Sequence, residues 1–153
     1  MEFTLKISLK LKAVALFATV TLPILSQAQF AKSEDAIKYR KAALTVMSTH
    51  FGRIGAVVKG APYNKDAVAS DANIVAMLST LPWQGFGPGH EGGNALPEVW
   101  SNADKFKSNA DKLQETTAAL KVAANSGDLE AIKKAFGATG QACKGCHDDF
   151  RKK

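Results

Sequence analysis

Residues 128–150, DLEAIKKAFGATGQACKGCHDDF, carry the pattern that decides the fold. Mostly apolar residues recur here at steps of three and four, at Leu129, Ile132, Phe136, Thr139, Cys143, Cys146 and Phe150. This spacing places them on one face of an α-helix that opens at Asp128. Three glycines within the stretch weaken helix propensity, but they also let a bulky group approach the backbone closely.

Three earlier segments repeat this spacing. Residues 33–58 give the series Ile37, Arg40, Leu44, Met47, Phe51, Ile54 and Val58. Residues 66–81 give Ala67, Asp71, Ile74, Leu78 and Leu81. A third segment, which follows the capping region Ser101-Asn102 and ends at Gly127, gives Phe106, Ala110, Leu113, Thr117, Leu120 and Ala124. Four amphipathic helices with mostly short links predict an all-α fold, an antiparallel four-helix bundle.

One link, from Pro82 to Asn102, is long and rich in glycine and tryptophan. A connection of this length is usually functional or packed rather than a plain turn. We expect Trp83, Phe86 and Trp100 to pack it onto the bundle. Its Gly87-x-Gly89-x-x-Gly92 spacing follows no strand and contains a proline, so it indicates loop geometry rather than a dinucleotide site.

The N-terminal residues predict export. Lys6, Lys10 and Lys12 precede an apolar run over residues 13–25, and Ser26-Gln27-Ala28 ends in small residues. This order is typical of a secretory signal peptide over residues 1–28, which leaves a single domain over residues 29–153. The apolar run is well short of the roughly 20 residues that a membrane-spanning helix needs, so we expect no membrane insertion after cleavage.

Composition removes one class of function. The formal net charge is +6 and falls to +4 without residues 1–28, which hold three lysines and one glutamate. Apart from a short tail, Arg151-Lys152-Lys153, no cluster of Lys and Arg is interleaved with aromatic residues, so the sequence gives little support to nucleic-acid binding.

The two cysteines lie in Cys143-Lys144-Gly145-Cys146-His147. Their spacing of three aims both thiols the same way on a helix. The two sulfurs can then bond the vinyl-derived carbons of a haem while His147 turns its imidazole toward the iron. Cys-x-x-Cys-His is the signature of c-type haem attachment. The motif therefore predicts one covalent haem c near the C-terminal helix, with His147 as the metal ligand.

A redox dithiol and a zinc site are the alternatives to haem attachment for these residues. A redox Cys-x-x-Cys is expected in a thioredoxin-like βαβ context, which this helical pattern lacks. A structural zinc site needs four ligands. Cys143, Cys146 and His147 supply three, and His50 or His90 would have to complete the set.

The whole of residues 29–153 resembles the cytochrome c′ family, the class II c-type cytochromes. The resemblance is carried by Gln29-Phe30-Ala31-Lys32, Tyr39-Arg40, His50-Phe51-Gly52-Arg53, Leu81-Pro82-Trp83, Phe86-Gly87-Pro88-Gly89, Glu91-Gly92-Gly93 and Cys-x-x-Cys-His-x-x-x-Arg. It implies a periplasmic protein, not a turnover enzyme, whose haem iron is five-coordinate and high-spin. His147 is then the only protein ligand, and nitric oxide and carbon monoxide bind in preference to oxygen.

The resemblance also assigns further residues. Leu44 matches the apolar side chain over the distal face, and Arg151 matches a basic residue over the proximal imidazole. Arg40 would pair with a haem propionate, which fits the cost of an unpaired charge on an apolar seam. Lys41 is a second propionate candidate, and Asn94 stands where the family often has an acidic residue near the haem edge.

The same residues can also have simpler roles in packing or on the surface. Leu44 can be an ordinary seam residue, and Arg151 or Lys41 can be solvated charges. Met47 and Met77 look like core residues, although Met47 is also a candidate axial thioether in a six-coordinate, low-spin electron carrier. The family implies a homodimer through the first two helices and a redox partner that the sequence does not identify.

Overall fold

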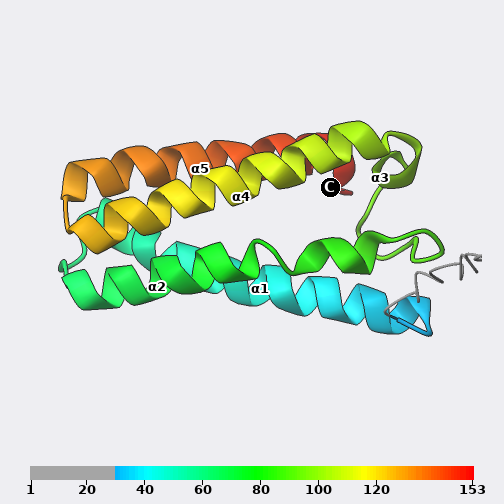
Figure 1. Cartoon of the computed structure of the whole chain (residues 1–153), viewed down its shortest axis with the longest axis horizontal. Coiled ribbons are helices and arrows are strands. Elements are labelled where there is room, and N and C mark those ends of the chain that lie inside the picture. The colour runs from blue at the N-terminus through cyan, green and yellow to red at the C-terminus, as the bar shows by residue number, and fades with distance from the viewer. Residues whose placement is uncertain (1–29) are drawn as a thin grey trace, which may run out of the picture.

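The computed structural model describes residues 30–153, so the predicted signal peptide lies outside the described residues. The four long helices are α1 (Ser33–Val58), α2 (Lys65–Leu78), α4 (Ala103–Ser126) and α5 (Leu129–Phe150). The long link contains a 3-10 helix, η1 (Pro82–Phe86), and a short helix, α3 (Glu98–Ser101). Figure 1 shows α1 and α2 beside each other below α4 and α5, with successive long helices running in opposite directions. This confirms the all-α, antiparallel four-helix bundle.

Local sequence sets several of the helix ends. The side chain of Asn64 accepts a hydrogen bond from the Ala67 amide at 3.0 Å and caps α2. Asp128 caps α5 in the same way, from the amides of Glu130 and Ala131 at 2.9 and 3.2 Å. Such caps satisfy amides that have no partner within their own helix. Between α4 and α5, Gly127 takes a left-handed φ of 82°, which glycine adopts without strain.

The core lies along the predicted seams of α1, α4 and α5. It is made by buried residues of the four long helices, Met47, Ile54, Val68, Ala72, Val75, Leu113, Leu120, Ala123, Ala124 and Ile132. Phe136 of α5 stacks on Phe51 of α1, with ring centroids 4.3 Å apart. The apolar spacing therefore identified the inward face of these three helices correctly.

The predicted seam of α2 was wrong by one residue. The buried positions are Val68, Ala72 and Val75, whereas Ala67 is exposed. Asp71 instead lies at the edge of the core, where its Oδ1 is 2.6 Å from Nδ1 of His50. The helix ends at Leu78, before Leu81, and Met77 is 58% exposed rather than buried.

No helix among residues 30–153 is both long and apolar enough to cross a bilayer. The long link is ordered and packed onto the bundle, as its aromatic residues predicted. Phe86 of η1 lies 5.0 Å from Phe106 of α4, centroid to centroid. The Trp100 indole N–H donates a hydrogen bond to the Phe86 carbonyl at 2.9 Å.

The C-terminus also holds the link. Ala95 and Arg151 form an antiparallel bridge. The Leu96 amide donates to the Phe150 carbonyl, and the Lys152 amide donates to the Asn94 carbonyl, both at 2.9 Å. These bonds place the middle of the link against the end of α5, next to the Cys-x-x-Cys-His motif.

Candidate haem-binding site

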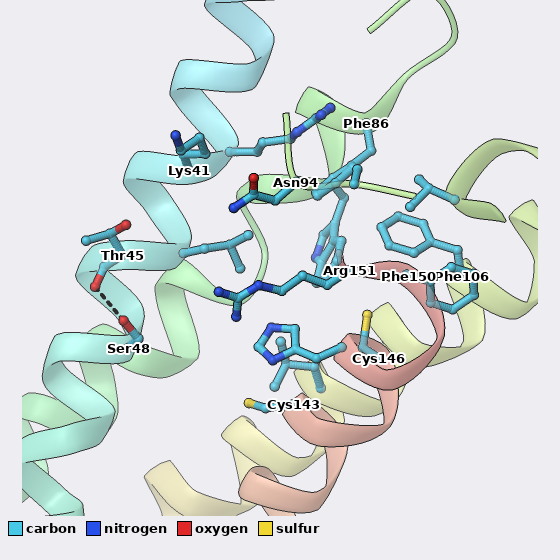
Figure 2. Close-up of a pocket in the computed structure, with 17 residues that line it drawn as sticks. Lys41, Thr45, Ser48, Phe86, Asn94, Phe106, Cys143, Cys146, Phe150 and Arg151 are labelled. Carbon is cyan, nitrogen blue, oxygen red and sulfur yellow. Dashed lines mark hydrogen bonds between the residues drawn. The ribbon is translucent and has the colours of Figure 1, made fainter. Parts of the chain in front are cut away.

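A cavity of about 300 Å³ opens where α1, the long link, α4 and the end of α5 meet. Figure 2 shows its lining side chains. It is lined by Arg40, Lys41, Leu44, Thr45, Ser48, Trp83, Phe86, Asn94, Ala95, Val99, Phe106, Leu113, Cys143, Cys146, His147, Phe150 and Arg151. All eight site residues predicted from the sequence are in this set, although more than 100 positions separate the first from the last.

Cys143 and Cys146 line the cavity from α5 (Figure 2) and form no disulfide. Burial raises the pKa of both thiols. For Cys146 the pKa rises to about 11, with smaller contributions from the charges of Cys143 and Asp149. Both side chains are therefore neutral thiols near neutral pH. Among residues 30–153 no group of three or more His, Cys, Asp and Glu is placed to hold a metal ion, so the described structure gives no support to the zinc alternative.

His147 follows the second cysteine on α5. Burial lowers its pKa, and the nearby cation of Arg151 lowers it further, while Asp148 opposes the shift. Although His147 is partly exposed to solvent, both effects favour the neutral imidazole, which is the form that binds a metal ion.

Arg151 reaches this position by a route that the helical pattern did not predict. Helix α5 ends at Phe150, and Arg151 has extended backbone angles. Its amide still donates to the His147 carbonyl at 3.2 Å, and the bridge to Ala95 fixes the residue. Arg151 thus lies beside His147 because the end of the chain pairs with the link, not because the helix continues.

Arg40 is 3% exposed and bound by the long link. Its Nη1 donates to the carbonyls of Gly85 and His90, the latter at 2.7 Å, and its Nη2 donates to the Gly92 carbonyl at 2.7 Å. Burial lowers the pKa of this guanidinium, and Glu91 opposes the shift. Backbone carbonyls therefore already compensate the seam charge, so the cost of burying it does not by itself require a propionate.

Leu44 lines the cavity from α1, but Met47 does not. Met47 is 7% exposed and packs in the core with Ile54 and Leu120. Lys41, Asn94 and Arg151 are exposed at the rim of the cavity.

Sequence reasoning did not assign the apolar wall to the site. Trp83, Phe86, Phe106, Leu113 and Phe150 all line the cavity. Three of them were identified only as seam residues of α4 and α5, and the two in the link only as packing residues. They could have been found by aligning the predicted antiparallel helices side by side. These residues then lie at about the same height along the bundle as the two cysteines.

The cavity fits a flat, largely apolar group that bears carboxylates. Its volume lies at the lower end of the range of about 300–1,000 Å³ that ligand pockets occupy. Aromatic and aliphatic side chains form the wall. Among residues 30–153 the lining includes three cations, Arg40, Lys41 and Arg151, and no Asp or Glu. Two thiols and a neutral imidazole lie on one helix. Haem c has the shape, charge and attachment chemistry that such a cavity accepts.

The fold and site define a class, the c-type haem proteins built on a four-helix bundle. The family model described as Cytochrome C′ matches residues 35–151. Cytochrome c′ of Alcaligenes xylosoxydans xylosoxydans is 51% identical over 126 residues, which are 82% of this chain and 99% of that protein. Cytochrome c′ of Rubrivivax gelatinosus is 46% identical over 129 residues, 82% of this chain and all of that protein.

Solved structures of cytochrome c prime are similar to this chain in both fold and sequence. A nitric oxide complex of a single-residue variant of cytochrome c prime from Alcaligenes xylosoxidans has a TM-score of 0.79 and 49% identity, over 82% of this chain and 99% of that chain. The chain belongs to the cytochrome c′ family, and it carries covalently bound haem c.

Proposed function

We propose that this protein is a periplasmic haem protein that binds nitric oxide and carbon monoxide, rather than oxygen, at a five-coordinate, high-spin iron. The observation that carries the proposal is the composition of the cavity. Cys143, Cys146 and His147 line it from α5, and the hydrocarbon Leu44 lines it from α1. The described lining residues include no methionine and no second histidine. The Met47 alternative gains no support, because Met47 packs in the core.

Each residue then has a role. Cys143 and Cys146 form the two thioether bonds, and His147 is the single protein ligand of the iron. Arg151 lies beside the imidazole, where its cation disfavours imidazolate character and so weakens the bond from His147 to the metal. Burial and Arg151 both lower the pKa of His147 and so favour the neutral imidazole, which suits it for this role.

Arg40, Lys41 and Asn94 are proposed to lie near the haem carboxylates. Lys41 and Asn94 are exposed at the rim, where a carboxylate stays in contact with water. Arg40 lies deeper and donates three hydrogen bonds to carbonyls of the link. A guanidinium has five N–H donors in total, so donors remain for a haem carboxylate.

Selectivity follows from Leu44. When bound, the haem supplies an iron with an open coordination position for a diatomic gas. The Leu44 side chain can neither coordinate a metal nor donate a hydrogen bond to a bound gas. Oxygen benefits from such a donor, whereas nitric oxide and carbon monoxide do not need one. The nitric oxide complexes of variants of the Alcaligenes relative support nitric oxide as a ligand of this chain as well.

The wider setting is part of the proposal. Residues 1–28 direct export and are removed. The mature protein binds and releases gas without turnover, and electron transfer to an unidentified partner is a second role.

We infer a homodimer through α1 and α2. Val46 on α1 is 46% exposed and Met77 on α2 is 58% exposed, which leaves apolar side chains on the helices that would form the interface.

Absorption and electron paramagnetic resonance spectra of the purified holoprotein test the proposal. We expect a high-spin ferric and ferrous haem, and a ferrous form that takes up nitric oxide and carbon monoxide but gives no stable oxygen complex. A low-spin spectrum with a thioether-to-iron band would instead establish the six-coordinate electron carrier. Intact mass that includes one haem, with alkylation finding no thiol, checks the two covalent attachments.

A further inference from the structure

A second hollow adjoins the haem cavity. Its volume is about 510 Å³, and it lies between the long link and the first turns of α4. It shares Trp83, Phe86, Val99 and Phe106 with the haem cavity. These four side chains therefore form a wall that the two spaces have in common. We refer to this space as the side hollow.

The side hollow is apolar inside and charged at its rim. Gly87, Pro88, Trp100, Ala103 and Ala110 complete its apolar lining. Glu91, Lys107, Asp111 and Gln114 form its polar border, and Lys107 is paired with Asp111. Its apolar lining can accept small apolar molecules.

Three aromatic rings form most of the shared wall, and two of them are held by polar groups. The Trp83 indole N–H donates to the Ser79 carbonyl at 2.7 Å. Phe86 is covered by the guanidinium of Arg40, 4.3 Å from its centroid. These contacts restrain both rings.

Phe106 makes ring contacts to Trp83, Phe86 and Phe150, at centroid distances of 5.8, 5.0 and 5.2 Å. Unlike Trp83, it has no side-chain hydrogen-bonding group that could fix the ring. Figure 2 shows Phe86, Phe106 and Phe150 along one side of the haem cavity. Rotation of the Phe106 ring therefore breaks no hydrogen bond, and Phe106 lines both spaces.

We propose that the side hollow is the entry chamber for a neutral diatomic gas and that Phe106 is its gate. The inference rests on the proposed gas-binding function and adds the path by which the gas arrives. The other opening of the haem cavity is bordered by Lys41, Asn94 and Arg151, where the haem carboxylates are proposed to lie. Although the side hollow also has charged residues at its rim, the wall that it shares with the haem cavity is aromatic and aliphatic.

The decisive variant fills the side hollow without touching the haem cavity. Ala103 is exposed and lines only the side hollow, so Ala103→Trp places an indole in its mouth. Ala118→Trp is the matched control, because Ala118 is exposed on the same helix and lines neither space. Carbon monoxide association is followed by flash photolysis of the ferrous holoprotein, with the haem spectrum and far-ultraviolet circular dichroism as checks of folding.

We expect Ala103→Trp to slow association roughly tenfold, equivalent to about 1.4 kcal/mol in the barrier, and to leave the final spectrum of the complex unchanged. Ala118→Trp should match the parent protein. Equal rates for all three proteins would overturn the route and leave the proposed function intact. A parent protein that binds no carbon monoxide or nitric oxide would overturn the proposed function and the route together.

Phe106→Ala provides a second measurement that does not depend on the Trp variants. Removing the ring should speed association and increase the fraction of photolysed gas that escapes before it rebinds. If Phe106→Ala gave the parent association rate and escape fraction with a normal haem spectrum, Phe106 would not be the gate.

Discussion

The guanidinium carbon of Arg40 lies 4.3 Å from the centroid of the Phe86 ring. The same guanidinium donates hydrogen bonds to three carbonyls of the link that begins with η1. One buried cation of α1 therefore holds the link at several points, and the link in turn supplies Trp83 and Phe86 to the haem cavity. The shape of the site depends on this anchoring as much as on the helices.

Arg40→Lys tests this anchoring. A lysine keeps the charge, but its single ammonium cannot reach three carbonyls or stack flat on a ring. We expect the free energy of unfolding of the holoprotein to fall by about 2–4 kcal/mol, because donors to carbonyls are lost inside the fold. Urea unfolding monitored by the haem spectrum and by circular dichroism measures this change.

Lys41→Ala is the control for charge near the haem, because Lys41 is exposed and no hydrogen bond of its side chain is present in the described structure. Its effect on stability should stay within about 0.5 kcal/mol. If both variants lost equal stability, the contacts of Arg40 with the link would not account for its effect.

The residues of α1 show what could and could not be predicted. The spacing of apolar residues placed Arg40 and Leu44 on the inward face, and the motif placed the haem at the end of the last helix. The partners of Arg40 could not be predicted, because they are backbone carbonyls of a glycine-rich link whose conformation depends on the bundle. At Gly85 an added Cβ would lie 2.8 Å from the Ala36 carbonyl oxygen, an approach that only the folded link defines.

The predictions for other residues were wrong for similar reasons. The pattern of α2 is short and ambiguous, so Asp71 was placed on the seam, whereas His50 draws it to the edge of α1. Met77 was expected inside because it is apolar, but apolar residues contribute much of any protein surface. The pairing of Arg151 with Ala95 could not be predicted either, because Ala95 lies more than 50 residues earlier in the chain.

Leu44→Ala tests the distal role of this side chain. Shortening it removes the hydrocarbon that lies between α1 and the haem cavity, so carbon monoxide association should accelerate by roughly tenfold or more. Stopped-flow mixing of the ferrous protein with carbon monoxide measures the rate. Met47→Leu, a near-isosteric change in the core, should leave that rate unaltered. A parent-like rate for Leu44→Ala would remove Leu44 from the site.

Two glycines one turn apart on α1 make a prediction about packing. A Cβ on Gly55 would lie 2.9 Å from the Phe136 ring, which is stacked on Phe51, whereas a Cβ on Gly52 meets nothing within 4 Å. Gly52→Ala should stabilise the protein by about 0.5–1 kcal/mol through helix propensity. Gly55→Ala should destabilise it, because overpacking of about 1–3 kcal/mol exceeds the same gain. Thermal unfolding of both variants compares them, and equal shifts would show that the Phe136 ring yields freely.

The proposed homodimer predicts opposite outcomes for two exposed valines. Val46 on α1 is 46% exposed and Val122 on α4 is 72% exposed. Val46→Glu would bury a charge in an interface between α1 and α2 of two copies, at a cost of several kcal/mol if it stays ionised and unpaired. We expect sedimentation to show a shift toward monomer for Val46→Glu and no shift for Val122→Glu. A parent protein that sediments as a monomer would exclude the dimer directly.

The raised pKa of Cys146 predicts how the haem-free chain reacts with alkylating reagents. Only the thiolate reacts, and burial together with the charges of Cys143 and Asp149 raises the pKa of Cys146 from 9.0 to about 11. Alkylation of the folded, haem-free chain at pH 8 should therefore be slower than in concentrated urea, roughly a hundredfold if the thiolate fraction alone decides the rate.

The same shift makes the stability of the haem-free chain depend on pH. Because the pKa of Cys146 is raised in the folded chain, the free energy of unfolding that this shift contributes is fully present below pH 9.0 and is lost as the pH rises through about 11. Cys146→Ala should remove this part of the alkaline loss of stability, and Cys143→Ala should lower the pKa of Cys146. Equal alkylation rates with and without urea, in a chain that circular dichroism shows to be folded, would mean that the thiols are not buried in the haem-free protein.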